Sequence, residues 1–155
     1  MLKMKKYFFL LIIFPLIFSE CQAGQPSGKE VISEPGKTVV QLTNDTFKKV
    51  IFNYEAGSEW KYAGKRPAII DFYADWCAPC RQLSPLVEEI AKEYSGKIDV
   101  YKVDTDKENV LSQKLGITGL PTLVFIPVEG KPQITMGAIP KETLVKAIND
   151  ILKVR

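Results

Sequence analysis

The stretch from Pro67 to Arg81, PAIIDFYADWCAPCR, constrains the fold of this chain more than any other. Its first half, Pro67–Tyr73, is an apolar run with a single acid, Asp71, which is typical of a strand buried on both faces. Its second half holds Cys77 and Cys80, and a helical apolar pattern follows directly. The two cysteines are therefore expected at a strand-to-helix junction, which any fold of the chain has to provide.

The surrounding pattern alternates strands and helices and then closes with a hairpin. Thr43 has the chemistry of a helix N-cap, and the segment Glu129–Pro132 that joins the last two strands reads as a turn. We expect strands at 38–42, 67–73, 98–103, 122–126 and 133–136, with helices after Thr43, after the cysteines, at 107–115 and at 141–152. Such an order predicts an α/β fold, with a central mixed sheet flanked by helices on both faces.

A long connection, 56–66, separates the first helix from the apolar strand. It contains two glycines and two aromatic residues, Trp60 and Tyr62. We expect the aromatic side chains to fix this loop to the core; a patch that binds a partner is the alternative.

Composition and charge exclude several functions. The 155 residues suffice for one domain with a core. Residues 1–23 hold three lysines and one glutamate, so the remainder carries 18 basic and 17 acidic residues. A nearly neutral domain gives no electrostatic case for binding nucleic acid. The chain has no histidine, which excludes Cys-His and Ser-His-Asp catalysis and histidine-ligated metals.

The first 23 residues have the pattern of an export signal. Lysines precede a twelve-residue apolar run, Tyr7–Phe18, which is short for a membrane span of about 20 residues. Cleavage after Ala23 is our first expectation. A lipoprotein signal that ends at Cys21, or an uncleaved anchor, is the alternative. In each case the domain would lie outside the cytoplasm, in the periplasm, with 24–37 as a flexible linker and 38–155 as the folded domain.

The position of the cysteines suggests redox chemistry. Backbone N–H groups at a helix start favour an anion, so the thiol of Cys77 should have a lowered pKa and act as nucleophile. Cys80 lies one turn further on and could resolve a mixed disulfide. Structural zinc usually needs four Cys or His ligands, which two cysteines supply only in a dimer. A purely structural disulfide would close a loop too small to stabilise the chain much.

With the motif placed at this junction, the chain resembles the thioredoxin family over about 39–153. AIIDFYADWCAPCR is similar to the family's active-site segment, with Ala78 where glycine is usual. ITGLPT, 117–122, is similar to its cis-proline loop, and MGAIPKETL, 136–144, to the start of its last helix. The connection before the apolar strand is longer than is typical of the family.

The resemblance implies a role for each matching residue. Cys77 would be the nucleophile and Cys80 the resolving thiol, joined as a disulfide in the oxidised state. Asp71 would act as base toward Cys80, usually through water, with Lys102 beside it. A cis Pro121 would lie beside the disulfide and leave the Leu120 backbone free for a substrate strand. The positions expected to face substrate are Trp76, Ala78, Pro79, Gly119, Leu120, Pro121 and Gly137.

The resemblance thus predicts a protein-disulfide reductase that acts on exported proteins through dithiol–disulfide exchange. We expect it to need no cofactor or metal and to be a monomer. Outside the cytoplasm its electrons would have to come from a membrane-embedded donor. The alternatives are a disulfide oxidase or isomerase, and a non-catalytic module in which the disulfide only shapes a peptide groove.

Overall fold

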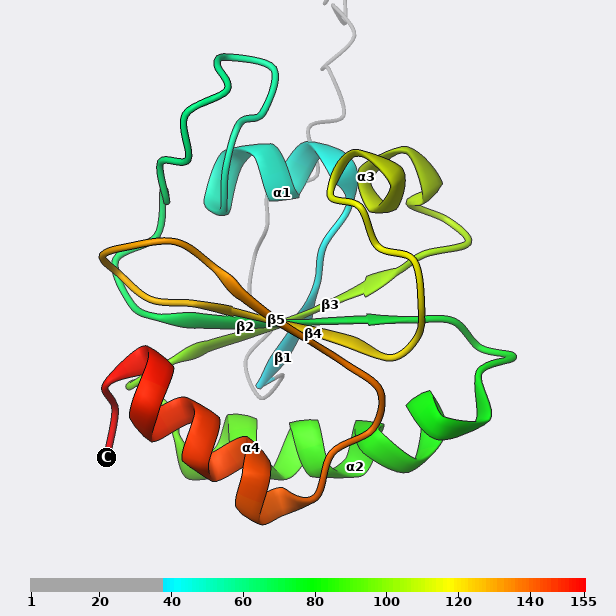
Figure 1. Ribbon diagram of the computed structural model, residues 1–155, viewed down its shortest axis with the longest axis vertical. Coiled ribbons are helices and arrows are strands. Elements are labelled where there is room, and N and C mark those ends of the chain that lie inside the picture. Colours follow the sequence, from blue (N-terminus) through cyan, green and yellow to red (C-terminus); the bar gives the residue numbers. More distant parts are fainter. Residues whose placement is uncertain (1–37) are drawn as a thin grey trace, which may run out of the picture. The chain divides into compact units, whose positions relative to one another are not determined.

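A computed structural model describes residues 38–155, which are built around a mixed five-stranded sheet in the order β1-β3-β2-β4-β5 (Figure 1). Strands β1 and β2 each pair with β3 in parallel, whereas β4 runs antiparallel to both β2 and β5. The mixed sheet predicted from the sequence is therefore confirmed. The strands are β1 Val39–Gln41, β2 Ala68–Tyr73, β3 Asp99–Asp104, β4 Thr122–Ile126 and β5 Gln133–Met136.

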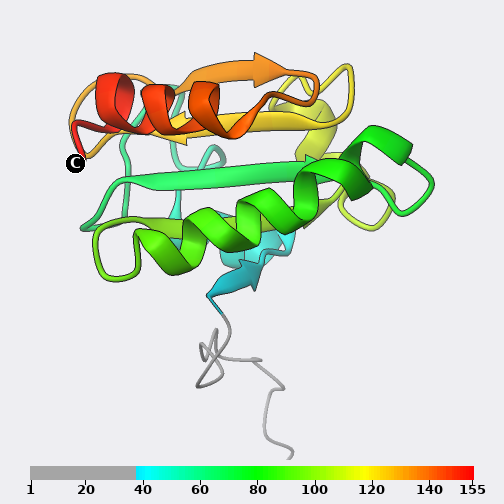
Figure 2. The same cartoon turned by 90° about the horizontal axis from the view of Figure 1, so that it is seen from below.

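Helices lie on both faces of this sheet. One face is associated with α1 and α3 and the other with α2 and α4, as Figures 1 and 2 show from two directions. This arrangement also agrees with the prediction. The helices are α1 Asn44–Val50, α2 Ala78–Glu93, α3 Asn109–Lys114 and α4 Lys141–Ala147, the last of which continues as a π-helical turn, η1 Ile148–Leu152.

Two helices differ from their predicted extents. The third helix begins at Asn109 rather than Lys107, because the preceding residues form a turn. In that turn Lys107 pairs with Asp104 at 2.6 Å, and the Asp106 backbone N–H donates to the same carboxylate at 3.1 Å. The last helix was expected to stay α-helical to Leu152, but it changes to π-helical hydrogen bonding from Ile148.

The alternation of side chains along the strands divides the core in two. One cluster contains Ile69 of β2 and Leu123 of β4 together with residues of α2 and α4. The other contains Ile70 and Phe72 of β2 together with residues of α1 and α3. We call these sides the α2/α4 face and the α1/α3 face.

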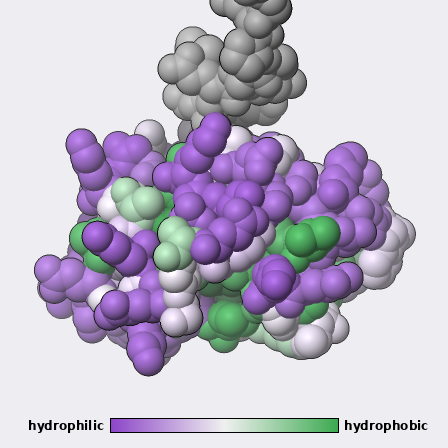
Figure 3. All heavy atoms as spheres, turned by 90° about the horizontal axis from the view of Figure 1, so that it is seen from above, coloured by the Kyte–Doolittle hydropathy of each residue, from purple (hydrophilic) through white to green (hydrophobic). Residues whose placement is uncertain are grey.

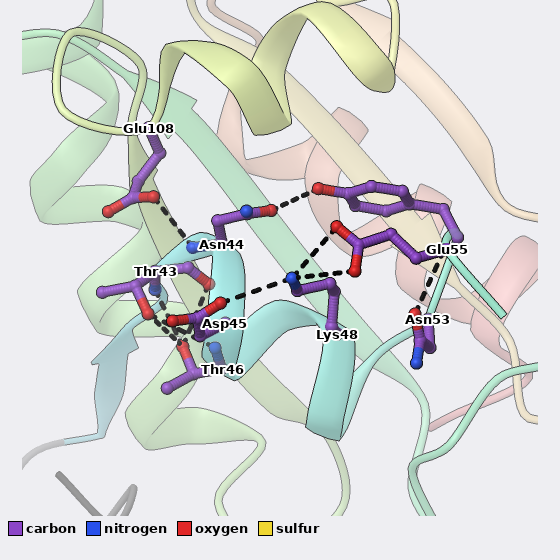
Figure 4. A network of polar contacts seen from close by, with 9 residues as sticks. Thr43, Asn44, Asp45, Thr46, Lys48, Asn53, Glu55 and Glu108 are labelled. Carbon is purple, nitrogen blue, oxygen red and sulfur yellow. Dashed lines mark hydrogen bonds and ion pairs between the residues drawn. The ribbon is translucent and has the colours of Figure 1, made fainter. Parts of the chain in front are cut away.

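The N-terminus of α1 is fixed by polar contacts, drawn in Figure 4. Thr43 caps the helix as predicted: its hydroxyl accepts from the Thr46 N–H at 3.3 Å, and its own N–H donates to the Thr46 hydroxyl at 2.8 Å. The Asn44 N–H donates to a carboxylate oxygen of Glu108 at 2.8 Å. Because Glu108 is the N-cap of α3, this bond ties the starts of the two helices together.

The aromatic residues of the long connection fix it to the core, as predicted. Trp60 packs on the α1/α3 cluster with its ring centroid 4.9 Å from that of Phe52. Tyr62 also packs there, and its hydroxyl donates to the Arg66 carbonyl at 2.7 Å. The side chains of Trp60 and Tyr62 thus hold the loop against the core, and the loop borders the α1/α3 face.

Within 38–155, none of the helices is both long and apolar enough to span a membrane. The predictions for the export signal, Cys21 and the linker 24–37 fall on residues 1–37, which lie outside the described part of the chain.

Candidate active site

The two cysteines lie where the sequence predicted, between the end of β2 and the first turn of α2. They form a disulfide with an S–S distance of 2.02 Å. Both are buried, with 4% of Cys77 and 2% of Cys80 exposed, and they pack against Ala74, Tyr73 and Leu120. A substrate can therefore reach the sulfur atoms only through direct contact with the residues around them.

Cys77 is the N-cap of α2, and its Sγ accepts a hydrogen bond from the Cys80 N–H at 3.2 Å. A thiolate at this position would accept the same bond and would face the positive end of the helix dipole. Ala78 and Pro79 form the exposed first turn, where proline is compatible with a helix. The geometry favours Cys77 as the sulfur that carries negative charge in the reduced state.

Asp71 is buried on β2 with 2% of its surface exposed. It follows Ile69 by two residues, so its side chain is on the α2/α4 face, toward the helix that carries Cys80. Burial raises the pKa of Asp71 to about 7, while the charge of Lys102 lowers it. One carboxylate oxygen has no hydrogen-bond partner within 38–155. A carboxyl group with a pKa near neutrality can both accept and return a proton.

Lys102 lies directly opposite Asp71 in the pairing of β2 with β3. Its ammonium group is also 5.6 Å from the ring centroid of Tyr73, a cation–π distance. The lysine is thus held between the buried acid and an aromatic ring that packs against the disulfide. This agrees with its predicted place beside the acid.

The loop before β4 is built as predicted, with a cis peptide bond between Leu120 and Pro121. Hydrogen bonds fix it on both sides: the Gly137 N–H donates to the Pro121 carbonyl at 2.8 Å, and the Thr122 hydroxyl donates to the Gly119 carbonyl at 2.7 Å. Gly137 has φ +93°, which a residue with a side chain rarely adopts. The Leu120 backbone makes no hydrogen bond within the described residues, so it can pair with an approaching chain.

Trp76 is 69% exposed beside the disulfide. Its indole N–H donates to a carboxylate oxygen of Asp106 at 2.9 Å, which fixes the orientation of the ring over the surface. An exposed aromatic ring next to buried sulfurs is suited to contact with an approaching protein surface.

Two neighbours of the site were missed in the sequence. Asp106 lies 30 residues from the tryptophan that it holds. Its position three residues after the predicted strand 98–103, close to the end of that strand, was the available signal. Met136 is 57% exposed, and its sulfur lies 2.7 Å from where a Cβ on Gly119 would be. It directly precedes Gly137, which the sequence did predict as a site residue.

These features together define a class of protein. A buried disulfide whose first sulfur caps a helix, with an acid of near-neutral pKa on the adjoining strand, is suited to exchange with external disulfides. Within 38–155, no group of three or more His, Cys, Asp and Glu side chains could hold a metal ion. The fold and the site are those of a thiol–disulfide oxidoreductase.

Comparison with known proteins identifies the family. The family model described as Thioredoxin matches residues 38–150. A thioredoxin of Borreliella burgdorferi is 47% identical over 111 residues, which are 72% of this chain and 95% of the relative, and thioredoxin 1 of a Nostoc species is 37% identical over 70% of this chain and 92% of its own. A crystal structure of chloroplastic thioredoxin z superimposes with a TM-score of 0.62 and 29% identity, covering 75% of this chain and 96% of that one.

The chain therefore belongs to the thioredoxin family, and residues 38–155 have the thioredoxin fold. Its activity is that of the family, the reduction of disulfides through a Cys-x-x-Cys pair, here Cys77 and Cys80.

Proposed function

We propose that this thioredoxin reduces disulfides of exported proteins outside the cytoplasm. The observation that carries the proposal is the lysine-led apolar segment at the start of the chain, which has the pattern of a secretory or lipoprotein signal. Cleavage after Ala23 would leave Cys77 and Cys80 as the only cysteines. In an oxidising compartment such a pair cannot form a wrong disulfide within its own chain.

The site residues suggest how the reaction proceeds. The Cys77 thiolate attacks one sulfur of the substrate disulfide; a Cys77–substrate bond forms, the substrate bond breaks, and the other sulfur leaves as a thiolate. Asp71 accepts the proton of Cys80, through water. The Cys80 thiolate then attacks the Sγ of Cys77, which forms the Cys77–Cys80 disulfide and releases the second substrate thiolate. The substrate gains two electrons and the protein loses two.

The direction of electron flow depends on the residues between the cysteines. Pro79 precedes Cys80, where a histidine cation would stabilise the thiolate and make the pair more oxidising. We therefore propose a low reduction potential and hence a reductase. Because few free thiols exist outside the cytoplasm, regeneration of the dithiol requires electrons from a membrane-embedded donor.

The reduction potential of Cys77–Cys80, measured on the purified protein in glutathione buffers, tests this direction. A value near that of thioredoxin, about −270 mV, is expected for a reductase. A value near that of DsbA, about −120 mV, would instead identify an oxidant.

Trapping of free thiols in cells tests the compartment and the donor. Rapid acid quenching followed by thiol alkylation should find the cysteine pair largely reduced, in the fraction that contains exported proteins. A pair that is always oxidised there would contradict the donor, and a protein found only in the cytoplasm would contradict export.

A further inference from the structure

The α1/α3 face contains a groove that the redox site does not use. Its volume is about 640 Å³, within the range of about 300 to 1,000 Å³ that is usual for ligand sites. The walls are mainly apolar: β2 contributes Ile70 and Phe72, β4 contributes Val124 and Ile126, and the long connection contributes Trp60. Such a hollow favours an apolar side chain or molecule that leaves water.

Strand β5 extends this apolar surface beyond the groove. Ile134 lines the groove and is 58% exposed, and Met136 is 57% exposed. They pair with Val124 and Thr122 of β4, so both point to the α1/α3 face of the sheet. Figure 3 views this face; hydrophobic residues come to the surface among polar ones along its lower margin, on the β5 side.

The exposed side chains of Ile134 and Met136 extend from the groove toward the redox site. Met136 packs over Gly119, in the loop whose Leu120 packs against the disulfide. The backbone of Gly137 is bonded to the same loop. A chain that approaches Cys77 over this loop therefore meets Met136 first and then Ile134, which lines the groove.

Two features favour a polypeptide in extended conformation as the occupant. Strand β5 pairs only with β4 among the described residues, so its outer edge offers unpaired backbone groups to another strand. The charges at the groove's rim, Glu59 and Lys131, are opposite in sign, so they favour neither an acidic nor a basic segment. Recognition would then depend on apolar side chains.

We propose that the groove binds an apolar side chain of an extended segment of the disulfide substrate whose cysteine reacts at Cys77. The proposal rests on the disulfide exchange described above and adds a preference among substrates. Pro132, which lines the groove, precedes Met136 by four residues. Four residues of extended chain span about 13 Å. The preferred leucine, isoleucine or phenylalanine should thus lie about four to six residues from the reactive cysteine.

Peptides of one cysteine, joined to glutathione by a disulfide, test the proposal. A single leucine is placed at each position from two to eight residues on either side of the cysteine, in a background of serine and glycine. The purified protein, with dithiothreitol as electron source, is assayed for release of the free peptide. We expect kcat/KM to rise about tenfold, as partial burial of a leucine allows, when leucine is four to six residues away on one side.

Three variants locate the preference. Ile134→Asp places a charge at an exposed position of the groove and should remove the leucine effect, whereas Ile134→Leu should keep it. Val128→Asp is the matched control, because Val128 is also exposed, at 47%, but lies outside the groove. It should keep the full leucine effect.

Reduction of glutathione disulfide, which is too small to reach the groove, separates this proposal from the redox function. The Ile134→Asp variant should reduce glutathione disulfide at the same rate as the native protein. If the native protein itself does not reduce glutathione disulfide, disulfide exchange is contradicted instead. The proposal is overturned if leucine has no effect at any position, or if Ile134→Asp slows serine and leucine peptides equally. It is also overturned if the groove has another occupant, either a second copy of the chain in a dimer or a bound amphiphile. In that case Ile134→Asp removes the occupant while the leucine preference persists.

Discussion

The two faces of the sheet use burial in opposite ways. The α2/α4 face is closed over its core and yet buries a carboxyl group, Asp71. The α1/α3 face is open to a groove at β4 and β5, and the sheet residues that line this groove are all apolar. The closed face can thus tune the proton affinity of one group, while the open face offers apolar sheet surface in its groove.

The largest expected effect follows from the assignment of chemistry to the start of α2. Cys77→Ser should abolish turnover of every disulfide substrate, because no thiolate remains to attack. Cys80→Ser should keep the first attack and accumulate a mixed disulfide, visible by mass spectrometry. Turnover by Cys77→Ser would contradict the order of the two thiols.

Replacement of one buried phenylalanine on each face with alanine tests whether the α2/α4 face is more closed than the α1/α3 face. Phe125 belongs to the α2/α4 cluster and Phe72 to the α1/α3 cluster, and neither is exposed. Phe125→Ala should lower the free energy of unfolding by about 5 kcal/mol, and Phe72→Ala by about 3 kcal/mol. The second value is smaller because Phe72 lines the groove, so no sealed cavity is left. Urea unfolding of the oxidised proteins measures both; equal losses would show that the groove does not relax the packing.

The buried acid should give the closed face a dependence on pH. The pKa of Asp71 is about 7 in the folded protein and 3.8 without burial, so between these values the folded state binds the extra proton. Stability should therefore fall as pH rises from about 4 to 7. Asp71→Asn should remove this fall and raise the free energy of unfolding at pH 8 by on the order of 4 kcal/mol.

Unfolding curves of the oxidised protein and of Asp71→Asn across this range provide the measurement. Below pH 4 the two proteins should differ little, because Asp71 is then protonated in both folded and unfolded chains. A variant that is no more stable at pH 8 than the native protein would mean that the carboxyl group is well solvated.

The smallest effect concerns the contact between the two helices of the closed face. Lys141 at the start of α4 pairs with Glu89 and Glu93 of α2, and these partners raise its pKa. Lys141→Met should lower the melting temperature slightly in low salt and not at all in high salt, because exposed ion pairs are screened. Lys146→Met is the control, since among residues 38–155 Lys146 pairs only with Asp150 of its own helical segment. An equal change in both variants would exclude a role in joining the helices.

The sequence predicted what local patterns determine. Strands β4 and β5 have the predicted boundaries, Thr43 caps its helix, and the single acid of β2 is buried. Each of these depends on side-chain alternation or on hydrogen bonds within a few residues. The cis bond at Pro121 came from the family resemblance rather than from any local pattern.

Features that depend on distant neighbours were not predicted. The bond from Trp76 to Asp106 joins segments 30 residues apart, and the groove exists only where the long connection packs beside β4 and β5. The turn that delays α3 arises from the Asp104–Lys107 pair, which competes with helix formation at that point. Helical periodicity alone does not predict that such a side-chain pair competes with the helix.

The positions of the two tryptophans have a practical consequence. The chain has only Trp60 and Trp76, and they lie at different sites: Trp76 is exposed beside the disulfide, while Trp60 is half-buried in the wall of the groove. A nearby disulfide quenches indole fluorescence, so emission from Trp76 should report whether the cysteines are oxidised. Emission from Trp60 should shift in wavelength when an apolar group displaces water from the groove. With Trp76→Phe and Trp60→Phe as single-probe proteins, redox state and groove occupancy can be followed separately in real time, without any added dye.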